Sequence, residues 1–308
     1  MSGSSPSTET NRQAPFPKVL VMLGLDHRDQ SVLDALELGA EALGAADVHV
    51  CHVSNRDPLP PVLASLGQAE VPSAPPELQA AVDRLREAFG TRRVVHSHHL
   101  IGPPEVVLSD VIEKLDVDLV IMGRNPAVDG QPGWGSARRK LLRLTTCSVL
   151  VVPHGTALNL DRIVCGLDFS DFAKTALSVA CRLGTGVDAV YQYDPSAVSD
   201  GGQKREDFRE KVANAAERHL AENVLVDSGP GFARPNLIVH PGGKVAEVLI
   251  RYAGEAPIVM GSRGLSPLAA MLLGSSADRV AGRALGPVLI VRRKGTVLGL
   301  LERLVHRG

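Results

Sequence analysis

The chain has 308 residues, which is the length of about two ordinary domains. Hydrophobic residues make up 44% of it, so each half can form an apolar core, but at 3% aromatic residues it offers few rings to stack on single-stranded nucleic acid. The 33 lysines and arginines nearly balance 34 aspartates and glutamates, which leaves no global field to attract nucleic acid or an anionic membrane. We therefore expect a globular protein with neither kind of partner.

The N-terminal segment predicts neither secretion nor a membrane anchor. Residues 1–16 lack the positively charged start and the apolar core of a signal peptide, and no apolar run reaches the eighteen residues of a membrane span. We expect these sixteen residues to form a disordered tail. The four cysteines show no CxxC spacing, so neither a zinc knuckle nor a redox dithiol is indicated. These features favour a cytoplasmic protein.

In chain order, short apolar runs of strand length alternate with longer segments of helical periodicity. The first half has strand-like runs at its beginning (KVLVML), before Gly123 (DLVIM) and after Cys147 (SVLVV). In the second half, strands are predicted at 163–167, 189–193, 237–239, 258–260 and 288–291, and helices at 172–183, 205–222, 245–253 and 276–284. This alternation predicts an α/β fold of open, doubly wound sheets, with five mostly parallel strands per domain and helices on both faces.

The chain contains an internal repeat with a period near 140 residues. The matching segments are, in order, Gly24-Leu25-Asp26 with Gly166-Leu167-Asp168, Gly123 with Gly261, Gly135-Ser136 with Gly274-Ser275, and SVLVV from Ser148 with PVLIV from Pro287. Ordered matches at a nearly constant offset predict two homologous domains, 17–155 and 156–294, joined by a short linker around 154–160. Residues 295–308 would form a C-terminal tail.

The most specific functional signal is the segment GSRGLSPLAAMLLGSS, which follows the fourth predicted strand of the second half. Glycines at 261, 264 and 274 would let the backbone approach a phosphate closely, and the next helix would direct its first N–H groups at that anion. Ser275 or Ser276 could add a hydroxyl donor. The structural alternative is a set of turn glycines followed by a serine helix cap.

With Gly261-x2-Gly264-x9-Gly274-Ser275 and the first-strand ending GLDFS at 166–170, the chain resembles the universal stress protein family in tandem form. The resemblance covers about residues 17–294. It implies an α/β nucleotide-binding fold, ATP as the ligand with Mg²⁺ as an optional companion, and a regulatory role in stress rather than a defined catalytic one.

The resemblance also implies roles for individual residues. Asp168 would contact the adenine edge and Leu167 would line that pocket, while Gly261 would lie against the ribose. The phosphates would be held by Gly264, Gly274, Ser275 and Ser276. From the residues alone, Asp168 is equally well explained as a capping or turn acid, and Arg263 either pairs with a phosphate or is simply solvated.

The first half departs from this signature. Asp26, Gly123, Gly135 and Ser136 are retained as candidate binding residues, but Pro126 stands where the second glycine belongs and has no N–H to donate. The loop is one residue shorter, and Asp129 adds a negative charge to it. The basic run 138–140 could compensate, or it could be a solvated helix face. We expect a weakened site in this half.

The clustered histidines at 96, 98 and 99 raise the possibility of a metal site. Period two would set His96 and His98 on one strand face, but local spacing shows no third ligand, so we interpret them as surface or edge-strand residues. His49 and His52 are interpreted as strand residues and Cys165 as a small core residue.

The chain has no Ser-His-Asp order, HExxH, GxSxG or Walker motif, and the GxGxxG turn of dinucleotide-binding domains is missing after its first strand. No catalytic residue can be named. The leading hypothesis is an adenine-nucleotide-binding regulatory protein that acts on an unknown protein partner. The alternatives are a weak ATPase or phosphoryl transferase using the same pocket, and a scaffold whose signature binds nothing.

The last predicted strand of each half is apolar throughout. An uncovered apolar edge would promote aggregation, so we expect residues 149–152 and 288–291 to meet and to join the halves as an internal pseudo-dimer. The C-terminal segment 297–305 has apolar residues at helical spacing, and we expect it to pack on its own domain or to mediate a homodimer.

Overall fold

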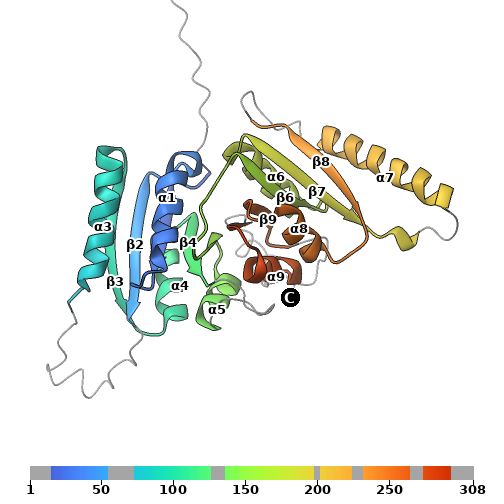
Figure 1. Ribbon diagram of the computed structural model, residues 1–308. Helices are drawn as coiled ribbons and strands as arrows, with labels where there is room; N and C mark the ends of the chain where they lie inside the picture. Colours follow the sequence, from blue (N-terminus) through green and yellow to red (C-terminus); the bar gives the residue numbers. More distant parts are fainter. Residues whose placement is uncertain are drawn as a thin grey trace, which may run out of the picture.

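A computed structural model of the chain describes residues 15–54, 73–125, 136–197, 202–223, 232–263 and 273–292 (Figure 1). The strands of the first half are β1 (Lys18–Leu23), β2 (Asp47–Ser54), β3 (Val94–Ile101), β4 (Leu119–Arg124) and β5 (Ser148–Pro153). Its helices are α1 (Asp29–Leu43), α3 (Pro76–Phe89), α4 (Pro104–Lys114) and α5 (Ser136–Leu144), with a 3₁₀ turn at Gly90–Arg92.

The second half repeats this order. Its strands are β6 (Arg162–Leu167), β7 (Gly186–Tyr193), β8 (Pro235–Pro241), β9 (Ile258–Gly261) and β10 (Val288–Val291). Its helices are α6 (Asp171–Leu183), α7 (Gly202–Asn223), α8 (Val245–Ala253) and α9 (Ser275–Arg283), with a 3₁₀ turn at Pro195–Ala197. The predicted α/β alternation is confirmed in both halves.

All ten of these strands form one continuous sheet, in the order β3-β2-β1-β4-β5-β10-β9-β6-β7-β8. Neighbouring strands within each half are parallel, whereas β5 and β10 pair antiparallel and join the halves. In that central pair Leu150 lies opposite Leu289, its equivalent in the repeat. A residue that faces its own equivalent marks a two-fold axis, so the prediction that the final strands meet as an internal pseudo-dimer is confirmed.

Helices cover both faces of the sheet, and each face has its own core (Figure 1). On one face α1, α3, α6 and α7 contribute buried side chains such as Leu36, Leu85 and Leu177. On the other, α4, α5, α8 and α9 contribute Leu108, Leu142 and Val280. Both cores continue from one half into the other across β5 and β10. These two strands are buried on both faces, so they carry apolar residues at successive positions.

Residues of the predicted N-terminal tail and of the predicted linker contribute to the core. Phe16, which we assigned to the N-terminal tail, is buried, and its N–H donates to the carbonyl of Leu43. In the linker Leu158 is buried, and its side chain lies 2.7 Å from where a Cβ on Gly39 would be. Residues 1–14 and the C-terminal segment 297–305 lie outside the described residues.

Each half also sends an arginine into the other half. Arg124, at the end of β4, donates to the carbonyl of Ala284 after α9, and Arg292, just after β10, donates to the carbonyl of Leu142 in α5. Burial lowers the pKa of each guanidinium to about 10, so both remain charged at neutral pH. A cation at a helix C-terminus also interacts favourably with the helix dipole.

The structure also shows where the cysteines lie and whether a described helix could cross a membrane. All four cysteines are free and buried, and burial raises the pKa of the Cys165 thiol far above its usual range, which confirms it as a core residue. Among the helices that the structure describes, none is both long enough and apolar enough to cross a membrane.

Candidate functional site

The strand order creates a crevice in each half. In the second half β7 follows β6 on one side while β9 lies on the other, so the chain order reverses between β6 and β9. The same reversal occurs between β1 and β4 in the first half. Ligands of open α/β sheets bind beyond the carboxyl ends of the strands at such points. The candidate residues can therefore be examined at two equivalent places.

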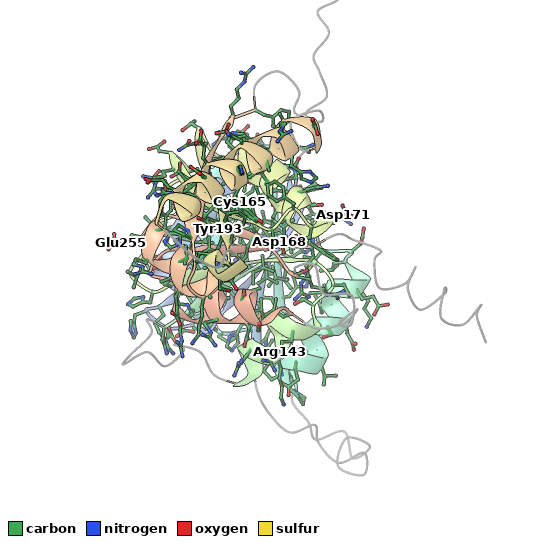
Figure 2. All side chains as sticks on the ribbon, turned by 90° about the vertical axis from the view of Figure 1, so that its right-hand side faces the viewer. Arg143, Cys165, Asp168, Asp171, Tyr193 and Glu255 are labelled. Atoms are coloured by element: carbon green, nitrogen blue, oxygen red, sulfur yellow. The ribbon has the colours of Figure 1, made fainter. Side chains whose placement is uncertain are left out.

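In the second half, Asp168 lies at this reversal point. It comes directly after β6, and in Figure 2 it lies between Tyr193, the last residue of β7, and Asp171, the first residue of α6. The register pairs Cys165 with Val259, which sets Leu167 beside Gly261 and Asp168 beside Ser262. Leu167 is buried against the core, so little of its side chain is available to line a pocket.

The carboxylate of Asp168 is only partly used by the protein. Within the described part of the chain, the backbone N–H of Ser170 donates to Asp168 Oδ1 at 3.0 Å, and no donor is recorded for Oδ2. Ser170 itself caps α6, since its hydroxyl accepts the N–H of Ala173 at 3.2 Å. Because Ser170 supplies the helix cap, Asp168 is not needed as the capping acid of α6.

Gly261 has a packing reason to be glycine. A Cβ at this position would lie 2.8 Å from the backbone carbonyl carbon of Phe172, because α6 packs directly onto the end of β9. Gly123 occupies the matching position at the end of β4, where a Cβ would lie 3.1 Å from Val32. The close helix-to-strand contact thus accounts for both glycines, whether or not a ribose is bound.

The helix α9 begins beside the end of β9. Gly274 precedes it, and its N–H donates to the carbonyl of the buried Ser262 at 2.8 Å. Its φ of −61° is open to any residue, while a Cβ would lie 3.3 Å from the same carbonyl oxygen. Ser275 and Ser276 form the first turn of α9 and are at least partly exposed.

Arg263 follows Ser262 and lies over the Phe172 ring, with 5.6 Å between the guanidinium carbon and the ring centroid. Burial lowers its pKa from the ordinary value. Gly264 lies outside the described residues. The structure therefore brings Asp168, Gly261, Arg263, Gly274 and the serines of α9 to one end of the β6–β9 crevice.

In the first half an arginine occupies the crevice. Arg28 Nε lies 2.8 Å from both carboxylate oxygens of Asp26, and its Nη1 donates to Asn125 Oδ1 at 3.1 Å. The hydrogen bond from Arg28 outweighs partial burial and lowers the pKa of Asp26 to about 2. Because Arg28 contacts both the turn after β1 and the end of β4, it bridges the reversal point of the first half.

The register also changes the expected equivalence of Asp26 and Asp168. β1 pairs Leu20 with Val120, and β6 pairs Val164 with Ile258, which makes Leu20 the counterpart of Val164. Gly24, not Asp26, then matches Asp168 in position. The positive φ of 60° shared by Leu25 and Phe169 supports this alignment. The triplet match in the sequence was displaced by two residues, because the turn from β1 to α1 is two residues longer than the turn from β6 to α6.

An aspartate closes that longer turn. The carboxylate of Asp29, the first residue of α1, accepts the backbone N–H groups of Gly24 at 3.0 Å and Leu25 at 2.6 Å. Such convergent N–H groups would otherwise suit an external anion. A pocket of about 440 Å³ lies beside the turn, and acids are prominent in its lining: Asp26, Asp29 and Glu77, with Arg84. This lining disfavours phosphate.

The remaining first-half candidates are only partly described. Gly135, Pro126 and Asp129 lie outside the described residues, and of Ser136 only its place at the start of α5 is known. In the basic run, Arg139 pairs with Asp278 and Lys140 with Glu105 at 3.2 Å. These two cations serve ion pairs within the protein, which favours the helix-face interpretation over compensation in the loop.

The structure groups side chains that the sequence left apart. Asp47 and His49 of β2 lie beside His96 and His98 of β3, because the register pairs His49 with His96. The sequence-based interpretation did not include Asp47 as a third partner, because it considered local spacing and Asp47 lies far from the histidine run along the chain. Two alternating patterns, DVH and HSH, on strands expected to be neighbours could have indicated it.

Comparisons with known proteins agree with this architecture. The profile of the universal stress protein family matches twice, at residues 18–153 and 159–292. A universal stress protein of Thermus aquaticus is 31% identical over 136 residues, which is 42% of this chain and 97% of that protein.

Solved structures extend the likeness to the paired arrangement. A universal stress protein of Archaeoglobus fulgidus superposes with a TM-score of 0.56 at 16% identity, covering 91% of this chain and 97% of that one. A Pseudomonas aeruginosa protein of unknown function gives a TM-score of 0.60 at 16% identity, covering 97% of this chain and all of the other. At this identity the likeness shows the fold alone.

Proposed function

Because the chain belongs to the universal stress protein family, we propose that it is a stress-response regulator that binds one adenine nucleotide, ATP, in the β6–β9 crevice. Occupancy would alter its stability or its contacts with a protein partner. The observation that carries the proposal is the carboxylate of Asp168 at the reversal point, which accepts one backbone N–H. In the first half the matching position is Gly24, which has no side chain, and the nearby Asp26 is held by Arg28. An unclamped carboxylate that faces position 6 of the base can accept the amine of adenine, whereas guanine has a carbonyl oxygen there and offers no donor, which favours adenine over guanine.

The phosphates would lie at the start of α9. The first-turn N–H groups of this helix and the hydroxyls of Ser275 and Ser276 are donors, and the helix dipole favours an anion there. Mg²⁺ would accompany the phosphates as part of the ligand. The free, buried cysteines fit a reducing compartment, and we include a cytoplasmic location in the proposal.

Titration calorimetry with ATP tests the number of sites. We expect one site per chain, weakened at least ~10-fold by Gly274→Val, which corresponds to ~1.4 kcal/mol, because the side chain enters the space where phosphate must approach the backbone. The matched control Gly135→Val should leave this affinity unchanged. Two equal sites, or one site that survives Gly274→Val in a folded variant, would contradict the assignment.

A second pair of variants tests the adenine contact. Asp168→Ala should reduce the preference for ATP over GTP, since the acceptor for the amine is removed. Asp26→Ala should leave that preference unchanged, because Arg28 already holds this carboxylate. Mass spectrometry of ligand released from the denatured protein identifies the natural nucleotide, and release of a guanine nucleotide would refute the adenine assignment.

A further inference from the structure

A second ligand site is indicated at the opposite end of the first half's sheet. β3 is the edge strand, and it pairs in parallel with β2 from Asp47 opposite Val94 onward. Side chains two residues apart lie on the same face of a strand, so Asp47, His49, His96 and His98 share one face. They lie toward the amino ends of their strands, away from the nucleotide crevices at the carboxyl ends.

Three of these side chains converge on one point. His96 Nε2 lies 2.9 Å from Asp47 Oδ1, and His49 Nε2 lies 3.4 Å from Asp47 Oδ2. The two imidazole rings are stacked, with their centroids 4.7 Å apart and their planes 13° from parallel. One ligand atom from each residue can be chosen so that all lie within 4.8 Å of one another. Two imidazole nitrogens and a carboxylate oxygen are the donor set of three-ligand zinc sites.

The carboxylate of Asp47 is incompletely satisfied without a cation. Its Oδ1 is inaccessible to water and accepts no hydrogen bond from the residues that the structure describes, although His96 Nε2 lies 2.9 Å away. A buried anionic oxygen without a donor is costly. Lys18, which pairs with Asp47 across β1 and β2, donates its ammonium to the carbonyl of Leu115 at 3.1 Å instead. A metal ion between the carboxylate and the imidazoles would satisfy this oxygen.

His98 supplies the outer partner that a metal-bound imidazole needs. Its Nε2 lies 2.9 Å from His49 Nδ1. A metal on His49 Nε2 leaves the proton on Nδ1, which can then be donated to His98.

We propose that Asp47, His49 and His96 bind one Zn²⁺ ion, with His98 orienting His49 and with a water molecule in the fourth position. Tetrahedral bonds of ordinary length set ligand atoms about 3.3–3.4 Å apart. The widest separation among the three ligand atoms, which lie within 4.8 Å of one another, therefore has to shorten when the ion binds. His96 can supply this movement, since 45% of its side chain is exposed, whereas His49 is 7% exposed and held in place. The ion would fasten the edge strand β3 to β2. This site is independent of the nucleotide proposal.

The test uses the full chain after removal of metal with a chelator. Competition against a chromophoric chelator measures Zn²⁺ affinity, and Co²⁺ substitution reports coordination through its visible absorption. We expect one Zn²⁺ per chain and tetrahedral Co²⁺ bands. His96→Asn should reduce the affinity at least ~100-fold, and His98→Asn less, about 10- to 100-fold, as an outer partner does. The control is His99→Asn, on the same strand but the opposite face, where the ring contacts Ser54.

Two outcomes would overturn the site. The first is a Zn²⁺ affinity of the wild type that is no higher than that of His96→Asn. The second is a loss of Zn²⁺ affinity in the His99→Asn control that is as large as the loss in His96→Asn. Thermal unfolding gives a second readout, because a ligand that binds only the folded state raises its stability. Zn²⁺ should raise the Tm of the wild type and not that of His96→Asn. Since His96 is half exposed, this variant should fold even where changes at the buried His49 do not.

Discussion

Arg139 of α5 and Asp278 of α9 occupy equivalent positions in the two repeats and pair with each other. Their helices correspond residue for residue, and Arg139 Nε donates to Asp278 Oδ1 at 3.1 Å. Arg143 also reaches Asp278, at 3.2 Å. In a symmetric dimer of identical chains, a residue at such a position faces its own copy, and a charged residue would be repelled. Duplication within one chain allows the two copies to carry opposite charges.

A charge-swap series tests this pair. Asp278→Asn should lower the free energy of unfolding by about 1 kcal/mol, because Arg139 is exposed enough for water to screen the pair. Asp278→Arg should lower it further, since it adds repulsion from Arg139 and Arg143. The double change Arg139→Asp with Asp278→Arg should recover the part of the lost free energy of unfolding that arises from repulsion by Arg139. Urea denaturation measures each value, and a double variant no more stable than Asp278→Arg alone would contradict the pairing.

The pair also predicts a pH dependence. Burial raises the pKa of Asp278, but the hydrogen bond and charge of Arg139 and the charge of Arg143 more than offset this, so the folded-state pKa lies below the ordinary value. The stability gained is therefore complete above the unfolded carboxyl pKa and is lost as the pH falls through the folded one. The stability difference between wild type and Asp278→Asn should be full at neutral pH and smaller near about pH 3. A stability difference between wild type and Asp278→Asn that grows as the pH falls would show that the ion pair is not its cause.

The glycines at the strand ends make a separate prediction. Gly261→Ala should cost about 1–3 kcal/mol of folding stability even without nucleotide, because its Cβ meets the backbone of Phe172, which cannot rotate away. Gly123→Ala should cost less, since its Cβ meets only a methyl group of Val32. Thermal unfolding of the nucleotide-free protein compares the two. Equal stability of Gly261→Ala and wild type would show that packing against Phe172 does not require the glycine.

The buried Arg124 predicts a strong coupling between the halves. Arg124→Ala should lower the free energy of unfolding by at least about 2 kcal/mol, because it removes the charge-assisted hydrogen bonds to Ala284 and Asn125 and leaves a cavity. Arg124→Met should lose less, since it restores most of the volume. Arg279→Ala, an exposed arginine on α9, is the control and should change stability by no more than about 0.5 kcal/mol. Hydrogen exchange at the end of α9 should increase in Arg124→Ala alone.

Much of this architecture could be predicted from local patterns. Strands that are apolar on both faces, helices with three- and four-residue spacing, and ordered repeats sufficed for two doubly wound halves and for the meeting of β5 with β10. These features depend on residues close in the sequence, or on burial that any fold must achieve. The glycine-serine signature likewise indicated the crevice between β6 and β9, because a helix start after a strand is a local feature.

Other properties depended on contacts between residues that are far apart in the chain, and the sequence does not indicate which of the many possible contacts form. Whether Asp26 is available depends on the side-chain direction of Arg28, and its equivalence to Asp168 depends on strand register, which a two-residue difference in turn length displaced. The histidine run lacked a third ligand until the pairing of β2 with β3 brought Asp47 beside it. The sequence by itself therefore determined the fold and the end of the sheet at which we propose a ligand site. The tertiary structure decided which groups are free to bind, because hydrogen bonds and charges are satisfied in space, irrespective of separation along the chain.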